Sequence, residues 1–308
     1  MKLRRLVALA SLLALACGDG PAARRDARVR AALERVRFVA YTPRGFEPGT
    51  GAPPVREDAL RADLALLRPS FSGLITYSAA EGLDAVPRVA RELGFRAVIV
   101  GVWSPTDAAE LALALAAARA EPDTVLALAL GNEGLFFHRY DAPALAAAFA
   151  RARAAAPELP LAVSEPFSVY LDHPESLPEA DLWLPNVHPI DQPWFGKGPP
   201  EASVDFVASV AAQLAEQASL PVLVKETGLP SGPTSDGFSE LAQAHFWGTL
   251  ATRLPRTRDH AYAWFEAFDS PWKPAHALEA PPGKREREAY FGLFRADGSA
   301  KPALEEVR

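Results

Sequence analysis

The chain has 308 residues, of which 49% are hydrophobic, and its formal net charge at pH 7 is -6. A chain of this length and apolar content can bury one large core, which fits a single α/β barrel better than two small domains. The negative charge argues against nucleic acid as a partner, because nucleic-acid binding needs a basic face, and it leaves neutral or weakly polar substrates open.

The first 17 residues have the pattern of an export signal. A positive region comes first, formed by Lys2, Arg4 and Arg5. The apolar stretch that follows, Leu6 to Ala16, is too short to span a membrane as a normal helix. Residues 14–17 (Ala-Leu-Ala-Cys) resemble the cleavage site of a bacterial lipoprotein, whose cysteine becomes the lipidated N-terminus. We therefore expect a lipoprotein signal peptide, lipidation at Cys17 and anchoring at the outer membrane, the cell surface or in the periplasm. An ordinary secretory signal cut near Ala16 is the alternative.

Residues 18–35 are predicted to be a flexible tether, because they are polar and charged and show no apolar periodicity before Val36. Residues 36–308 should then form the catalytic domain. Cys17 is the only cysteine, so an exported domain of this sequence has no disulfide and depends on its core for stability. A monomer is the default expectation.

Eight apolar, β-favouring segments follow, and helical patterns separate most of them. The strand candidates are 37–41, 73–77, 97–102, 124–133, 161–165, 182–188, 221–226 and 261–266. The helical candidates are 55–67, 85–93, 106–120, 142–155, 203–218 and 238–253. Asp107, Asp141 and Ser203 are candidate N-caps or first-turn residues. Strands and helices that alternate in this way predict a (β/α)8 TIM barrel, in the α/β class.

Two features of the pattern limit this prediction. The connection between the fifth and sixth strands is short and contains Pro174 and Pro178, which disfavours a helix there. The rival architecture is a doubly wound open sheet, which would need a glycine-rich phosphate loop after the first strand. The segment in that place, residues 42–47, is not such a loop.

Two glutamates each follow a buried strand candidate directly. Glu133 ends the sequence Gly-Asn-Glu after residues 124–130, and Glu226 follows residues 221–224. The C-terminal ends of barrel strands meet at one mouth, so the two carboxyl groups should face each other. An acid and a nucleophile placed in this way can cleave a glycosidic bond with retention of configuration.

Asn132, beside Glu133, can donate a hydrogen bond to the sugar 2-hydroxyl, a contact that strengthens in the transition state. A cap for a helix near Gly134 is the alternative role for this pair. The other strand ends and their loops also carry side chains that suit a sugar. The candidate substrate-binding residues are Asn132, Tyr41, Tyr77, Glu165, His188, Trp194, Glu266, Asp269, Trp272 and Lys273.

Several of these residues have an alternative role that is structural. The two tyrosines, Tyr41 and Tyr77, could be core residues. Glu165 could pair with Lys225 or Arg44 instead of binding sugar. The three charged residues near the last strand, Glu266, Asp269 and Lys273, could form a salt-bridge cluster. His188 is expected to support the site through a hydrogen bond rather than to bind a metal.

The motifs resemble those of glycoside hydrolase family 17, in clan A of the glycosidases, which contains β-1,3-glucanases and related glucan transferases. The resemblance rests chiefly on residues 131–133, 226–231 and 265–273. Residues 186–189 and 290–294 agree with it, and residues 164–167 look like its bacterial branch. It spans residues 36–304. Leu229 stands where the family usually has tryptophan, and the loops are short, which predicts a more open cleft.

The resemblance implies that Glu133 is the general acid/base and Glu226 the nucleophile, with their carboxyl groups roughly 5 Å apart. We therefore predict a retaining glycosidase that acts on a β-linked glucan, with β-1,3 linkage favoured. A glucanosyltransferase would use the same glutamates with a different acceptor, and the loop 189–200 would decide between the two. A glycan-binding barrel without turnover is a third possibility, but binding alone needs no carboxylate pair.

No cofactor and no metal are expected. The six histidines are scattered and none shows a His-x-x-x-His spacing. The sequence also has neither a Gly-x-Ser-x-Gly elbow nor a Walker loop, which argues against serine hydrolase and nucleotide chemistry.

Overall fold

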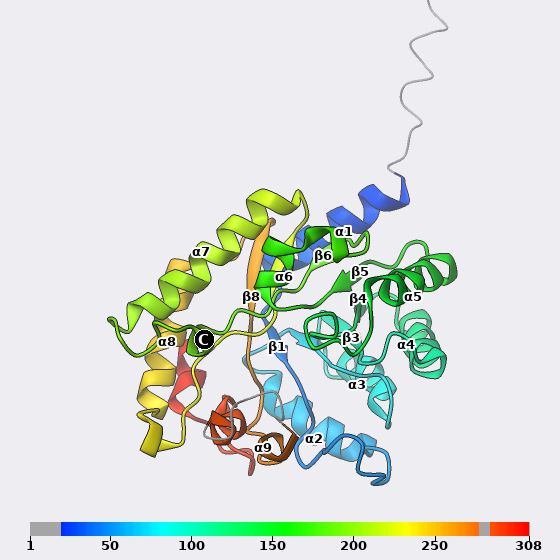
Figure 1. Ribbon diagram of the computed structural model, residues 1–308. Helices are drawn as coiled ribbons and strands as arrows, with labels where there is room; N and C mark the ends of the chain where they lie inside the picture. The colour runs from blue at the N-terminus through cyan, green and yellow to red at the C-terminus, as the bar shows by residue number, and fades with distance from the viewer. Residues whose placement is uncertain (1–19, 277–283, 308) are drawn as a thin grey trace, which may run out of the picture.

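Eight parallel strands close into a barrel in the computed structural model, which describes residues 20–276 and 284–307 (Figure 1). Each strand pairs with the next along the chain, and β8 pairs with β1. The strands are β1 Phe38–Ala40, β2 Gly73–Ile75, β3 Ala97–Val102, β4 Val125–Leu130, β5 Leu161–Val163, β6 Leu182–Trp183, β7 Val222–Val224 and β8 His260–Trp264. The predicted TIM barrel is confirmed.

Helices surround the barrel, and all of them except α6 and α9 lie at predicted places. They are α2 Glu57–Leu67, α3 Val86–Glu92, α4 Ala108–Ala120, α5 Ala142–Ala155, α6 Phe167–Asp172, α7 Glu201–Ala218, α8 Glu240–Arg253 and α9 Lys273–His276. The side chains of Asp107 and Asp141 accept hydrogen bonds from backbone N–H groups of the first turns of α4 and α5, as N-caps do. Ser203 lies in the first turn of α7. The short α6 agrees with the prolines that follow it.

Strand β8 alternates small and large side chains between the two faces of the sheet. In β8, Ala261 and Ala263 belong to the core inside the barrel, whereas Tyr262 and Trp264 belong to the core between the barrel and the helices. The Trp264 ring stacks on Trp247 of α8, with 4.4 Å between ring centroids. Small inward residues leave room for the opposite strands, and large outward ones hold the helices in place.

The prediction of a flexible tether at 18–35 is wrong for the residues that the structure describes, because Pro21–Arg35 form helix α1. Val29 and Leu33, four residues apart on one helix face, are fully buried against the core inside the barrel. Arg25 donates to Asp181 at 2.8 Å, and Arg28 donates to the carbonyl oxygen of Val125 at 2.7 Å. The helix therefore covers the N-terminal end of the barrel, and β8 runs from this end towards α9 in Figure 1.

The remaining N-terminal expectations, including lipidation at Cys17, fall on residues outside those that the structure describes. Within residues 20–276 and 284–307, no helix is both long and apolar enough to cross a membrane.

Candidate active site

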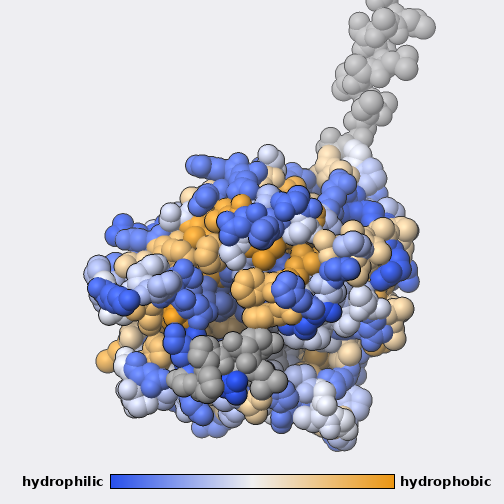
Figure 2. Space-filling model, in the orientation of Figure 1, coloured by the Kyte–Doolittle hydropathy of each residue, from blue (hydrophilic) through white to orange (hydrophobic). Residues whose placement is uncertain are grey.

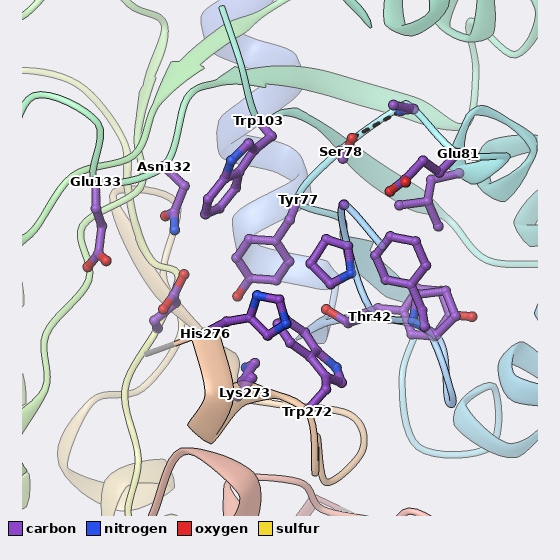
Figure 3. A pocket seen from close by; sticks show the side chains of 18 of the residues that line it. Thr42, Tyr77, Ser78, Glu81, Trp103, Asn132, Glu133, Trp272, Lys273 and His276 are labelled. Atoms are coloured by element: carbon purple, nitrogen blue, oxygen red, sulfur yellow. Dashed lines mark hydrogen bonds between the residues drawn. The ribbon is translucent and has the colours of Figure 1, made fainter. Parts of the chain in front are cut away.

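A cavity of about 780 Å³ opens at the C-terminal ends of the strands, which is where TIM barrels place their reacting groups. Glu133 and Glu226 both line it, as the sequence predicted. In Figure 3, Glu133 and Asn132 lie on one side of the cavity, Thr42 and Glu81 on the other, and Tyr77 between them. The surface in Figure 2 is hollowed near its centre, with hydrophobic side chains gathered beside the hollow.

Glu226 follows β7 and is held by two cationic groups. Its Oε1 lies 2.9 Å from the Lys225 Nζ, and its Oε2 lies 3.5 Å from the His188 Nε2. Burial by itself would raise the pKa of Glu226, but Lys225 and His188 more than offset burial and hold that pKa well below its usual range. The environment therefore keeps Glu226 ionised.

His188 contacts Glu226 and does not line the cavity. Its ring packs edge-on against Phe265 and Phe291. Burial opposes protonation of this ring, yet the Glu226 carboxylate offsets it and leaves the pKa of His188 raised. The expected supporting role fits this placement.

Asn132 joins the two glutamates through its side-chain amide. Its Oδ1 accepts hydrogen bonds from Lys225, from the Ser164 hydroxyl at 2.9 Å and from the Asn186 amide at 3.1 Å. Lys225 can only donate, so it fixes which way the Asn132 amide turns. The amide nitrogen is left to point into the cavity, as Figure 3 shows, in a position to donate to a sugar.

Glu133 has a strained backbone and a carboxyl group whose pKa is raised. Its φ of 55° lies in the left-handed region that non-glycine residues rarely adopt. The Asn186 amide donates to its Oε1 at 2.9 Å. Burial and, second, the charge of Glu226 raise the pKa of Glu133 to about 7. Near neutral pH a large share of Glu133 is therefore protonated, next to an ionised partner.

The prediction that Glu165 binds substrate is wrong. Its fully buried carboxylate accepts hydrogen bonds from the backbone N–H groups of Leu135 at 3.0 Å and Phe136 at 3.3 Å. It therefore fixes the turn that follows Glu133 and does not line the cavity.

Three other predicted substrate contacts also point elsewhere. The Tyr41 hydroxyl donates to Asp63 of α2 at 3.2 Å, so this buried tyrosine belongs to the core even though it borders the cavity. Asp269 accepts from the Lys301 ammonium at 2.6 Å and lies outside the cavity. The Trp194 ring packs on Phe206 of α7, and Trp194 does not line the cavity.

Besides Asn132 and Tyr41, the predicted residues Tyr77, Trp272 and Lys273 line the cavity. The Lys225 Nζ lies 4.6 Å from the centroid of the Tyr77 ring, and Figure 3 shows the Tyr77 hydroxyl pointing into the site. Lys273 donates to Glu266 at 2.6 Å. Glu266 is buried and does not line the cavity, so its role is to place Lys273.

The sequence did not reveal the parts played by Lys225, Asn186, Trp103 and Arg139. Strand alternation predicts that Lys225 points away from Glu226, but β7 ends at Val224, so alternation does not extend to this pair. Trp103 and Arg139 both line the cavity, and the Arg139 guanidinium lies 4.6 Å from the centre of the Trp103 ring. In the part of the chain that the structure describes, no three His, Cys, Asp or Glu side chains are grouped to hold a metal ion. The absence of a metal requirement stays a prediction.

Two carboxyl groups whose environments favour opposite protonation states, at one cavity in the mouth of a (β/α)8 barrel, are typical of a glycosidase site. The profile of the BtgE/BtgC glycoside hydrolase domain matches residues 39–292. The chain therefore belongs to this family, and the resemblance to glycoside hydrolase family 17 is confirmed.

Individual relatives agree with this assignment. A protein of Arthroderma benhamiae described as a glucan 1,3-beta-glucosidase is 26% identical over 257 residues, which cover 78% of this chain and 82% of the relative. A Rhizomucor miehei beta-1,3-glucanosyltransferase, solved as an active-site mutant with laminaritriose, superposes with a TM-score of 0.64 at 19% identity, covering 87% of this chain and 96% of that one. An endo-laminarinase from Formosa Hel1_33_131 gives a TM-score of 0.65 at 18% identity, covering 86% and 84%. At these identities the two structures show the shared fold alone.

Proposed function

We propose that the protein is a retaining glycosidase that cleaves β-1,3-glucan through a covalent glycosyl-enzyme. The observation that carries the proposal is the arrangement of Glu133 and Glu226. They line one cavity, share the Asn132 amide network, and have environments that favour opposite protonation states. A purely binding site would not need this division of roles, and retention of configuration is supported by the resemblance to glycoside hydrolase family 17.

In the first step the Glu226 carboxylate attacks the anomeric carbon, and Glu133 gives its proton to the glycosidic oxygen as the bond to the leaving sugar breaks. The product is a glycosyl ester on Glu226. In the second step Glu133, now ionised, takes a proton from water while the water oxygen attacks the same carbon. The ester bond breaks and Glu226 returns to its starting form with the original sugar configuration.

The surrounding residues support this sequence without entering it. Lys225 and His188 keep Glu226 ionised before attack, and Lys225 also fixes the Asn132 amide whose nitrogen faces the sugar. The choice of β-1,3-glucan is supported by the relatives described as a glucan 1,3-beta-glucosidase, a beta-1,3-glucanosyltransferase and an endo-laminarinase.

A glucanosyltransferase is the second candidate, and one observation favours keeping it. No residue of the segments after β5 and β6 lines the cavity, including the loop 189–200. A second sugar chain could therefore approach from this side and take the place of water in the second step.

The test is a product profile from β-1,3-gluco-oligosaccharides of defined length, with the Glu226→Gln variant beside the full chain. Only shorter products would identify a hydrolase, and products longer than the input would identify a transferase. Turnover by Glu226→Gln, or no turnover of any β-1,3 substrate by the unaltered chain, would contradict the proposal.

For location, we propose a lipid anchor at Cys17, supported by the lipoprotein-like sequence at 14–17. Three residues separate Cys17 from the first residue of α1, and α1 is fixed to the end of the barrel opposite the active site. An anchored barrel would therefore present its cavity away from the membrane. Cys17→Ser should release the protein from the membrane fraction, and unchanged partition would refute the anchor. A monomer remains the expectation.

A further inference from the structure

The cavity is one-sided with respect to the catalytic pair. Apart from Glu226, its lining comes from the segments that follow β1, β2, β3, β4 and β8, and none comes from those after β5 and β6. A cleft that accepts the middle of a long chain needs walls and exits on both sides of the scissile bond. This cavity supplies walls on one side.

The proposed mechanism identifies which part of the substrate lies on the walled side of the catalytic pair. The sugar attacked by Glu226 lies beside Tyr77, and the leaving sugar begins at the oxygen that Glu133 protonates. The cavity extends from Glu133 past Tyr77 to Thr42 and Glu81 (Figure 3). It therefore lies on the glycone side and receives the non-reducing portion of the chain.

On this side of the cavity, contacts join each loop to the next one around the rim. Between the segments after β8 and β1, the His276 Nε2 and the Glu47 Oε1 meet at 3.0 Å. Between the segments after β1 and β2, the Val55 N–H donates to the carbonyl oxygen of Glu81 at 2.8 Å. These two contacts join the segments after β8, β1 and β2 to one another.

The wall continues through the next two junctions. Glu110 of α4 accepts from the Ser78 hydroxyl at 2.6 Å and from the Trp103 N–H at 2.8 Å, and so joins the segments after β2 and β3. The Arg139 guanidinium, from the segment after β4, lies 4.6 Å from the centre of the Trp103 ring. Five consecutive loops are thus linked edge to edge around the glycone side.

We propose that the enzyme acts on chain ends, holding the non-reducing end of a glucan in a blind pocket that the Glu47–His276 pair closes. The inference rests on the proposed function and adds the part of the substrate that the site accepts. A cavity of about 780 Å³ is in the size range that encloses small ligands rather than polymers. The released glycone is accordingly a short saccharide.

The Glu47–His276 junction is the one to open, because it is made by two side chains at the rim rather than by backbone. Their side chains are 45% and 41% exposed, so removing them leaves the core intact. A matched control exists on the outer helices. Glu201 and His245 form a similar pair at 3.6 Å, with 44% and 56% exposure, and neither lines the cavity.

The experiment uses the full chain in detergent and laminarihexaose with a fluorophore at its reducing end. One form of this substrate has a free non-reducing end, and the other carries a 4,6-O-benzylidene cap there. The cap collides with a blind wall, so we expect the uncapped form to be cleaved about 100-fold faster or more. Glu47→Ala/His276→Ala should lower this ratio about tenfold or more. Glu201→Ala/His245→Ala should leave it unchanged.

Equal cleavage of the two forms by the unaltered chain would overturn the blind pocket while leaving the proposed function in place. An unchanged ratio in the Glu47/His276 variant, with an unchanged circular dichroism spectrum, would overturn the assignment of the closure to this pair. Failure to cleave even the uncapped form would instead contradict the proposed function on which the inference rests.

Discussion

Replacing Glu226 with glutamine should lower the pKa of Glu133, because it removes a negative charge that opposes ionisation of Glu133. The pKa of Glu133 is raised from 4.5 to about 7 by burial first and by Glu226 second. Two unit charges roughly 5 Å apart interact by about 3 kcal/mol at an effective dielectric constant of about 20, which is about two pKa units. Since burial remains in the variant, we expect a fall of about one to two units, to a value still above 4.5.

The assay is a carbon-13 NMR titration of protein labelled at the glutamate carboxyl carbons. The Glu133 signal is identified by its loss in a Glu133→Gln variant. Glu81→Gln is the matched control, because Glu81 also lines the cavity but is not among the causes of the Glu133 shift. An unchanged Glu133 pKa in Glu226→Gln would mean that the two carboxyl groups do not sense each other. That result would refute the reasoning for a coupled acid and nucleophile.

Three further predictions concern the pH profile, the nucleophile and helix α1. The ratio kcat/KM should fall as the pH rises through about 7, where Glu133 loses its proton. Asn186→Ala should move this fall to higher pH, because the hydrogen bond from Asn186 favours the ionised form of Glu133. A fall at unchanged pH in the variant would contradict this role of Asn186. Lys225→Met should lower kcat about 100-fold or more in steady-state kinetics, because it removes the nearer of the two cationic groups from a buried carboxylate. An unchanged kcat would refute the pairing. Leu33→Ala should lower the free energy of unfolding in urea by about 2–5 kcal/mol, whereas Leu241→Ala, at a side chain 74% exposed, should change it by about 0.5 kcal/mol or less. Equal effects of the two leucine substitutions would mean that α1 adds nothing to the core.

The barrel could be predicted from the sequence because its pattern is repeated. Apolar runs and helical periods recur along the chain, and two of the predicted N-caps, Asp107 and Asp141, lie where expected. Helix α1 was not predicted because it buries only two large apolar residues, Val29 and Leu33, among alanines and arginines. Its stability comes from contacts with distant parts of the chain, such as the ion pair between Arg25 and Asp181, which a local pattern does not contain.

The catalytic pair could be predicted for a different reason. Carboxyl groups that follow buried strands are expected at the barrel mouth, and the family motifs around Glu133 and Glu226 singled out these two. The direction of a side chain one or two residues beyond a strand depends on where the strand stops. Glu165 follows β5 by two residues, as Glu226 follows β7, yet its carboxylate binds the backbone of a neighbouring loop instead of lining the cavity.

Contacts between loops were the least predictable part of the site. Glu47 and His276 are 229 residues apart in the sequence, and neither lies in a recognisable motif. Their meeting depends on the closure of the barrel between β8 and β1, which brings the two loops together. Only the folded arrangement shows that the glycone side of the cavity has an end wall.

The central claim is that Glu226 forms a covalent bond to the sugar. The most direct measurement is the mass of the protein after incubation with 2,4-dinitrophenyl 2-deoxy-2-fluoro-β-laminaribioside, followed by peptide mapping. The fluorine slows both steps and the good leaving group restores the first, so the glycosyl-enzyme accumulates. The account predicts a mass increase of one fluorinated disaccharide located on Glu226. A label on any other residue, or turnover of the natural substrate with inversion of configuration, would contradict it.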